Sequence, residues 1–343
     1  MALRSLLWPS SDAVCPSPLN PQPITDRLPL GTMGIAILSG ILASLQDMKT
    51  SSSRFLSTSG TSTPLEELPL RLPSRFIACV RRPESAKKLT TAFAPYVTPT
   101  SSSAVIIFQN DNVSAAHQAD IILLACKPYM FKEILTEPGM SAALQGKLLI
   151  SILAGVTEIQ IYDVLSASPS DLVVVRAMPN TASLIRESMT VIGTPTPPLP
   201  VATSSLVTWI FRRIGDVVYL PPTTLDACTA LCGSGPAFFA LMLEAAIDGA
   251  VAMGLPRAEA QRMAAQTMRG TAGLVLNGDH PALLRDKVST PGGCTIGGLL
   301  VLEEGRVRGT VARAVREATV VASQLGKGVQ GVNGTRFGGN QLS

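Results

Sequence analysis

Histidine is nearly missing from this chain, which has only 2 His, His117 and His280, among 343 residues. So few imidazoles argue against a histidine-rich metal site and against a catalytic triad that uses histidine, and no metal is expected. Charged residues are also scarce, at 15% of the chain, and the formal net charge is +4 with no dense basic stripe. The sequence therefore gives no reason to expect a nucleic-acid partner.

Aromatic residues make up 4% of the chain, yet 46% of it is hydrophobic, so the apolar content is mostly Ala, Val, Leu and Ile. This composition excludes wholesale disorder and suits buried strands and closely packed helices. At about 150 residues per domain, the length predicts two domains.

The six cysteines are scattered and include no C-x-x-C pair, as expected of reduced thiols inside a cell. The uncharged run 190–211 is broken by four prolines, so no membrane span is expected. Residues 1–15 resemble neither a signal peptide nor a transit peptide. We therefore predict a cytoplasmic protein with no membrane partner.

Apolar strand candidates alternate with helical segments through the first half of the chain. A helix is predicted over 33–48, and strands over 76–80, 104–108, 121–125, 148–153 and 172–175, with the last strands over 189–192 and 217–219. Such alternation is typical of an α/β fold whose parallel sheet is buried on both faces.

Helical spacing replaces this pattern in the second half, with helices predicted over 235–252, 256–276, 281–286 and 293–324. Helices rich in Ala and Gly with few polar faces favour a homo-oligomer, while ordinary packing within one chain is the alternative. The predicted division is an irregular segment 1–30, a dinucleotide-binding domain 31–220 with a Ser/Thr-rich insertion 50–74, a helical domain 221–325 and a flexible tail 326–343.

A partial dinucleotide fingerprint opens the helix predicted over 33–48. The run Gly31-Thr32-Met33-Gly34 looks like the back half of G-x-G-x-x-G, in which glycines let a helix N-terminus approach a pyrophosphate. Pro29 stands at the first glycine position, and residues 21–28 alternate too poorly for a central strand. We therefore expect the first strand of the sheet to be missing, which a replaced first exon would explain. A helix start without a ligand is the alternative.

Polar residues follow several predicted strands, where open α/β sheets bind ligands. Arg81 and Arg82 end the strand 76–80 and favour the 2′-phosphate of NADPH, with a solvated charge pair as the alternative. Lys127 follows the strand 121–125 and could meet a phosphate or a carboxylate. Arg176, Asn180 and Thr181 suit a polar pocket floor or a structural turn.

The strongest motif is the run Asp286–Thr295. Its two glycines precede a helix and expose backbone N–H groups beside hydroxyls, which predicts a site for a carboxylate-sized anion. A tight connection between helices is the alternative, as it is for the Gly/Ser turn 232–236.

Together these motifs resemble those of the pyrroline-5-carboxylate reductase family, with the fungal branch most similar over residues 31–325. The most specific part is Leu284–Thr295, supported by Gly31–Ala36, Ala125–Pro128, Ala154–Val156, Met178–Thr181 and Gly233–Ala237. The resemblance implies a Rossmann-like NAD(P)-binding domain followed by an all-helical dimerisation domain. It implies hydride transfer from NADPH, with NADH possible, to 1-pyrroline-5-carboxylate, giving L-proline in the last step of proline biosynthesis.

The resemblance also implies site residues. The substrate carboxylate would bind the Gly292–Gly293 amides and the Thr295 hydroxyl, with Val288 and Thr290 nearby, and Thr295 would be the catalytic residue that hydrogen-bonds the ring nitrogen. The cofactor would contact Gly31, Thr32, Met33, Gly34, Arg81, Arg82, Asn112, Ala125, Cys126, Lys127, Pro128, Ala154, Gly155 and Val156.

Two alternatives stay open at this point. Without its first strand and first fingerprint glycine, the chain could be a catalytically weak member of the fold that acts only through its helical dimer. A related imine or β-hydroxyacid dehydrogenase is the other, although β-hydroxyacid dehydrogenases usually use a helical lysine that the segment 235–252 lacks. Glu244 and Asp248, on one face of that segment, are interpreted as caps or interface contacts.

Overall fold

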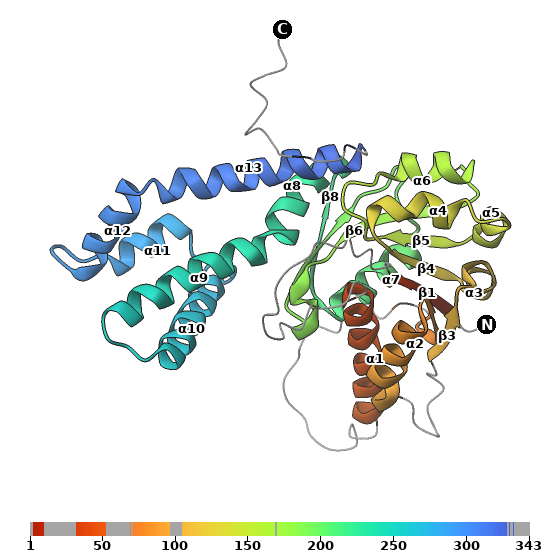
Figure 1. The fold of residues 1–343 in the computed structure, drawn as a ribbon, viewed down its shortest axis with the longest axis horizontal. Helices are drawn as coiled ribbons and strands as arrows, with labels where there is room; N and C mark the ends of the chain where they lie inside the picture. Colours follow the sequence, from red (N-terminus) through yellow and green to blue (C-terminus); the bar gives the residue numbers. More distant parts are fainter. Residues whose placement is uncertain are drawn as a thin grey trace, which may run out of the picture. The chain divides into compact units, whose positions relative to one another are not determined.

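The computed structural model describes residues 3–9, 32–52, 69, 71–96, 105–168, 170–327, 329 and 332, with the backbone alone for 3–9, 32 and 49–52. The chain forms two compact units (Figure 1). The first consists of Met1–Gly233 together with Val320–Ser343, and the second of Ser234–Thr319. The boundary between the two units thus falls between residues 233 and 234. We had predicted it between residues 220 and 221. Most of the expected insertion 50–74 and tail 326–343 lies outside the described residues.

An eight-stranded sheet forms the centre of the first unit, in the order β3-β2-β1-β4-β5-β6-β7-β8. Strands β1 to β6 are parallel, β7 is antiparallel to β6, and β8 is parallel to β7. The first six have the order of a Rossmann domain, which confirms the predicted α/β class. The bounds are β1 Leu3–Pro9, β2 Pro73–Val80, β3 Val105–Gln109, β4 Ile121–Ala125, β5 Leu148–Ser151, β6 Val173–Met178, β7 Ser188–Gly193 and β8 Gly215–Leu220.

The first strand is present, so our expectation that residues 1–30 are irregular and lack it was wrong for residues 3–9. Strand β1 pairs in parallel with β2 on one side and with β4 on the other, and its end, Pro9, lies opposite Ala125. A central parallel strand needs only a short apolar run, and Leu6-Leu7-Trp8 within Leu3–Pro9 is one. We had looked for the strand directly before the helix, at 21–28. Residues 10–31 are outside the described part of the chain.

Helices cover both faces of the sheet because successive strand residues point to opposite sides. On one face Phe76 and Ala78 of β2 pack with α1, α2 and α7. On the other, Ile77 and Cys79 pack with α3 to α6. The bounds are α1 Thr32–Ser52, α2 Pro83–Phe93, α3 Asn112–Gln118, α4 Phe131–Leu135, α5 Met140–Leu144, α6 Glu158–Leu165, α7 Val201–Arg212 and α8 Leu225–Cys228, with single helical turns η1 Ala94–Tyr96, η2 Pro128–Met130, η3 Thr181–Ile185, η4 Pro222–Thr224 and η5 Thr229–Gly233.

The remaining helices are α9 Gly235–Ala252, α10 Arg257–Leu276, α11 Pro281–Val288, α12 Cys294–Glu304 and α13 Val307–Gly326. The single helix predicted over 293–324 was wrong, because it is two helices. Gly305 ends α12, and Arg306 adopts a left-handed backbone with φ 53°. A left-handed residue cannot continue a right-handed helix, and no proline marks the break in the sequence.

Candidate functional site

The carboxyl edge of the sheet brings together most of the predicted cofactor residues. Val80 lies opposite Gln109, and Leu124 opposite Ser151, so the segments that follow β2, β3, β4 and β5 leave the sheet at one edge. The strand order reverses between β1 and β4, which is where open α/β sheets bind their ligands. The observed register therefore supports a dinucleotide site at this edge.

Helix α1 begins with the partial fingerprint. Gly31 is outside the described residues, and only the backbone of Thr32 is described, while Met33 and Gly34 lie in the first turn, where Gly34 is buried. The Ser183 hydroxyl donates to the Met33 sulfur at 3.4 Å, and also to the Asn180 carbonyl oxygen at 2.5 Å. The Asn180–Thr181 motif that we interpreted as a pocket floor or a turn therefore forms a turn that packs against the start of α1.

Arg81 and Arg82 follow β2 directly and are exposed. Arg82 is the N-cap residue of α2, which begins at Pro83. Asn112 opens α3 after β3, and the Asp111 side chain accepts a hydrogen bond from the Ser114 amide to cap that helix. The Asn112 amide nitrogen donates to Glu137 Oε1 at 2.6 Å. Glu137 was not predicted, and it fixes the orientation of the Asn112 side chain.

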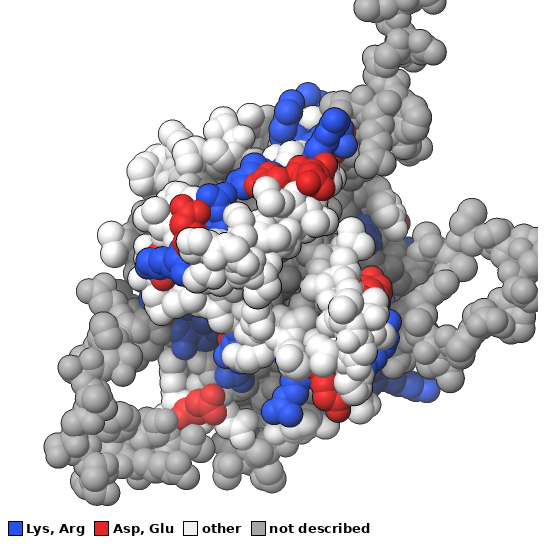
Figure 2. All heavy atoms as spheres, turned by 90° about the vertical axis from the view of Figure 1, so that its left-hand side faces the viewer, with Lys and Arg blue, Asp and Glu red and all other residues white. Residues whose placement is uncertain are grey.

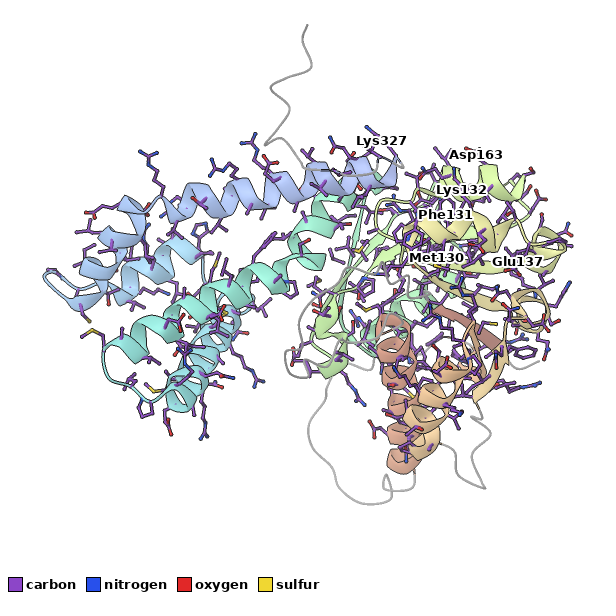
Figure 3. All side chains as sticks on the ribbon, in the orientation of Figure 1. Met130, Phe131, Lys132, Glu137, Asp163 and Lys327 are labelled. Atoms are coloured by element: carbon purple, nitrogen blue, oxygen red, sulfur yellow. The ribbon has the colours of Figure 1, made fainter. Side chains whose placement is uncertain are left out.

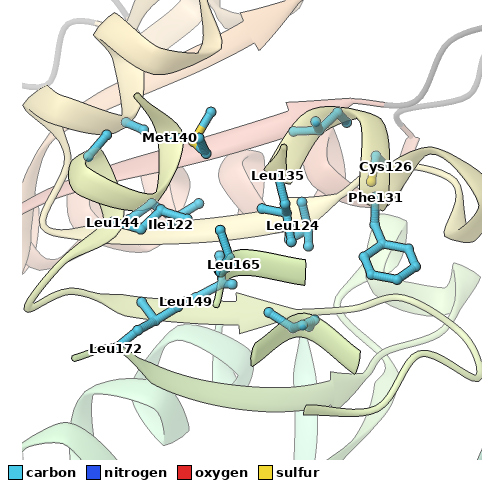
Figure 4. Close-up of a cluster of buried hydrophobic side chains, with 14 of the residues drawn as sticks. Ile122, Leu124, Cys126, Phe131, Leu135, Met140, Leu144, Leu149, Leu165 and Leu172 are labelled. Atoms are coloured by element: carbon cyan, nitrogen blue, oxygen red, sulfur yellow. The ribbon is translucent and has the colours of Figure 1, made fainter. Parts of the chain in front are cut away.

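The segment Ala125–Pro128 leaves β4 and turns at once into η2, where the Lys127 carbonyl oxygen accepts from the Met130 amide at 2.9 Å. Cys126 is buried beside Phe131 at one end of a hydrophobic cluster (Figure 4). Burial raises the pKa of the Cys126 thiol to about 12, because the thiolate is poorly solvated there. Cys126 therefore supports this turn by packing, while Lys127 is only partly buried.

Thiol labelling checks the Cys126 environment. We expect iodoacetamide at pH 8 to leave Cys126 unmodified in the native protein, because alkylation requires the thiolate and this thiol stays protonated. Exposed Cys294 is the internal control and should be carboxamidomethylated under the same conditions. Peptide mass spectrometry after quenching measures both, and rapid modification of Cys126 without unfolding contradicts the burial described here.

The loop Ala154–Val156 joins β5 to α6. Gly155 is buried with a left-handed backbone, φ +75°, a conformation that favours glycine. Thr157 and Gln160 form a capping box that starts α6, in which Gln160 Oε1 accepts from the Thr157 amide at 2.8 Å. The Gln160 amide nitrogen also donates to the carbonyl oxygen of Gly326, at the end of α13, at 2.7 Å.

A buried charge lies beside this loop. Arg176 in β6 is 5% exposed, and its guanidinium is 3.8 Å from a carboxylate oxygen of Glu158, the first residue of α6. Burial lowers the pKa of Arg176, while Glu158 and Asp226 oppose that effect by charge attraction. Two carboxylates near one guanidinium argue against an anion site, so Arg176 is better described as a link between β6 and α6. Glu158 was not predicted, although an acidic residue at a helix start is a recognisable signal.

The predicted substrate residues lie in the second unit, on the loop between α11 and α12. Thr290–Gly293 form a turn with proline second and Gly292, φ +67°, third, closed by a hydrogen bond of 3.0 Å from the Gly293 amide to the Thr290 carbonyl. The Gly293 amide is therefore occupied, contrary to our assignment of it to the substrate. The amides of Cys294 and Thr295 open α12, and amides at that position have no acceptor within their own helix.

The last position of this turn leaves little room for a side chain while the Thr290 hydroxyl keeps its place. A Cβ on Gly293 would lie 2.4 Å from the Thr290 hydroxyl oxygen, whereas nothing lies within 4 Å of one built on Gly292. No side chain caps α12, and Thr295 is partly buried while Val288 and Thr290 are exposed. The start of α12 thus offers helix amides and the Thr295 hydroxyl to an anion.

Apolar side chains cover much of the second unit. Across Ser234–Thr319, the buried hydrophobic side chains are those of Ile247 and Ala260. Figure 2 shows a face on which uncharged residues predominate. Large exposed apolar side chains here are those of Phe239, Leu241, Met253, Leu255, Met263, Leu274, Leu276, Leu283, Val288, Ile296, Leu300, Val301, Leu302 and Val307.

Comparison with known proteins gives two family matches. Residues 222–325 match the family described as pyrroline-5-carboxylate reductase dimerisation, and residues 28–155 match the one described as NADP oxidoreductase coenzyme F420-dependent. One stretch of helices, Pro222–Ala252, is long and apolar enough by length and composition to cross a membrane. It lies within the dimerisation match, so a protein surface is the better explanation for its apolar side chains.

Curated relatives that are similar to this chain are named pyrroline-5-carboxylate reductase. A pyrroline-5-carboxylate reductase of Lophium arboricola is 68% identical over 90% of this chain and 94% of its own, and one of Neurospora crassa is 60% identical over 89% and 94%. Among solved structures, a pyrroline-5-carboxylate reductase of Coxiella burnetii is 26% identical with a TM-score of 0.66, covering 86% of this chain and 95% of its own. The Plasmodium falciparum pyrroline carboxylate reductase with NADP bound has a TM-score of 0.65 at 24% identity, with 86% and 95% covered.

Proposed function

We propose, because this chain belongs to the pyrroline-5-carboxylate reductase family, that it reduces 1-pyrroline-5-carboxylate to L-proline with hydride from NAD(P)H. The observation that carries the proposal is the 68% identity with a curated reductase across 90% of this chain. The observed Rossmann sheet and the Asp286–Thr295 motif fit this activity. The product places the enzyme at the last step of proline biosynthesis.

The carboxyl edge of the sheet fits a dinucleotide. Buried Gly34 lets the first turn of α1 face a pyrophosphate through backbone amides, and the left-handed Gly155 shapes a second backbone turn at the same edge. Arg81 and Arg82 bind the 2′-phosphate, so NADPH is the preferred cofactor. Asn112, Lys127 and the Ala154–Val156 loop complete the site, and NADPH supplies the hydride when it is bound.

The start of α12 binds the substrate carboxylate. The amides of Cys294 and Thr295 donate to it, and the positive end of the helix dipole favours the negative charge, so the single proton of the Thr295 hydroxyl stays available to the ring nitrogen. The turn Thr290–Gly293 orients these donors, which is the role we give Gly292 and Gly293. Val288 and Thr290 flank the bound ring.

The reaction needs little acid–base catalysis. A protonated cyclic imine is already electrophilic, so the protein's task is to position it. Hydride adds to the C=N carbon, the C=N π electrons become a lone pair on nitrogen, and the resulting amine takes its proton from water. Thr295 Oγ–H donates to that developing lone pair, a contact that strengthens as the transition state is approached. A chain with two histidines can therefore perform it.

The second unit associates with another copy of this chain. Its exposed apolar side chains exceed what a helical unit normally leaves in water, and the matching family is described by its dimerisation. A homodimer or a larger homo-oligomer is thus the proposed assembly. The cytoplasmic location stays a prediction that cell fractionation tests.

The alternative of a weak or inactive homologue has lost its main argument, because β1 occupies the centre of the sheet. The deciding experiment is steady-state reduction of 1-pyrroline-5-carboxylate by the purified chain, followed as NADPH absorbance with proline identified by chromatography. Stoichiometric proline formation supports the proposal. NADPH binding without proline formation refutes it.

A further inference from the structure

The last turn of α13 lies against the loop that joins β5 to α6 (Figure 1), and both belong to the first unit. This contact is between backbones. A Cβ on Gly326 would lie 2.0 Å from the carbonyl oxygen of Gly155, and one on Gly155 would lie 2.7 Å from the Cα of Gly326. No side chain fits on either side without moving one of the two segments.

Gln160 fastens the same contact. Its amide nitrogen donates to the Gly326 carbonyl oxygen at 2.7 Å, while its amide oxygen accepts from the Thr157 amide at 2.8 Å. One side chain therefore joins the end of α13 to the first turn of α6. Figure 3 labels Lys327, which follows Gly326, and Asp163 of α6 in this part of the molecule.

The loop held in this way, Ala154–Val156, is one of the backbone turns that complete the cofactor site in the proposed function. A loop that binds a ligand through its backbone works only when its φ and ψ angles are fixed, and a misplacement of about 1 Å can cost up to about 100-fold in activity. Gly155 has a left-handed backbone, φ +75°, and because glycine populates positive and negative φ about equally, contacts with the rest of the fold are what fix it there.

We infer that Gly326 and Gln160 are positioning residues for the cofactor: they hold the Ala154–Val156 loop in its NADPH-binding conformation through the end of α13. The inference rests on the proposed function for the identity of the ligand. It concerns residues that neither contact the reacting atoms nor belong to the predicted cofactor set.

The first test is Gly326→Ala in the full chain. The added methyl group must push Gly155 away, so we expect the Kd for NADPH, measured by fluorescence titration without substrate, to rise about tenfold or more. KM for NADPH should rise with it, while KM for 1-pyrroline-5-carboxylate stays unchanged. Gly309→Ala is the matched control on the same helix, since, apart from the neighbouring backbone of α13 itself, no described atom lies within 4 Å of a Cβ there.

Gln160→Glu is the second variant and covers the case in which Gly326→Ala does not fold. Glutamate keeps an acceptor for the Thr157 amide and suits a helix N-terminus, but it cannot donate to Gly326. Weaker NADPH binding in both variants supports the inference. If Gly326→Ala does not fold, weaker NADPH binding by Gln160→Glu that persists at high salt supports the inference, because salt screens charge repulsion. Weaker binding by Gln160→Glu that high salt abolishes, or that a folded Gly326→Ala does not share, indicates charge repulsion and overturns the inference, as do unchanged Kd values or a parallel rise of both KM values. If the wild-type chain binds NADPH but makes no proline, the proposed function is refuted. The Kd measurements for NADPH then still test the inference about Gly326 and Gln160.

Discussion

Replacing Thr295 with alanine is expected to lower kcat about 2- to 10-fold at saturating NADPH and substrate. A hydrogen bond to a neutral nitrogen lone pair contributes about 0.5–1.5 kcal/mol, and each 1.4 kcal/mol changes a rate about tenfold. The loss should appear in kcat because the donor acts on the lone pair that forms during hydride transfer.

Two variants make this result specific. Thr295→Ser keeps the hydroxyl and should recover most of the turnover. Thr271→Ala removes a hydroxyl that bonds only the Thr267 carbonyl oxygen within α10, and should leave kcat at the wild-type value. If Thr295→Ala turns over at the wild-type rate, Thr295 has no catalytic role.

Removing both arginines after β2 is expected to raise KM for NADPH about 10- to 100-fold and to leave KM for NADH unchanged. Each charge-assisted hydrogen bond to a phosphate contributes about 1.5–3 kcal/mol, less where water screens it, as at exposed Arg81 and Arg82. NADH has no 2′-phosphate, so it loses no contact. Steady-state kinetics of Arg81→Ala/Arg82→Ala with both cofactors measure the ratio.

The matched control is Lys87→Ala/Lys88→Ala, which removes the same charge from exposed positions on α2, the helix that directly follows Arg82. This variant should keep its preference for NADPH. Equal increases in KM for NADPH and NADH in the arginine variant would show that these side chains serve the fold or the pyrophosphate, and the assignment to the 2′-phosphate would be wrong.

The sequence predicted most of the sheet because buried parallel strands are short apolar runs that end at polar residues. It failed at β1, since we tied the strand to the helix it normally precedes, and here residues 10–31 separate β1 from α1. The apolar residues around Leu3–Pro9 can be read in the sequence. The position of this strand in the sheet, however, depends on its pairing with β2 and β4, which are distant in sequence.

At the candidate site, too, the sequence predicted what depends on neighbouring residues and missed what depends on residues far along the chain. The Thr290–Gly293 turn follows from Pro and Gly at fixed positions, whereas we interpreted the motif through its two glycines, as exposed backbone N–H groups ahead of a helix. That the Gly293 amide is used inside the turn is a matter of geometry. Glu137 and Gly326 gave no signal. The Thr157–Gln160 spacing is that of a capping box, but it does not reveal the second hydrogen bond of Gln160, whose partner Gly326 is 166 residues away.

The domain that binds the dinucleotide is interrupted in sequence, because its main segment ends at Gly233 and it resumes at Val320. During synthesis the ribosome makes the sheet first, yet the end of α13 arrives only after the whole helical unit has been translated. The domain therefore cannot complete its fold in simple N-to-C order. A stop codon just before Gly326 would leave every strand and every predicted cofactor residue encoded, and would still remove the support of a loop made early in translation.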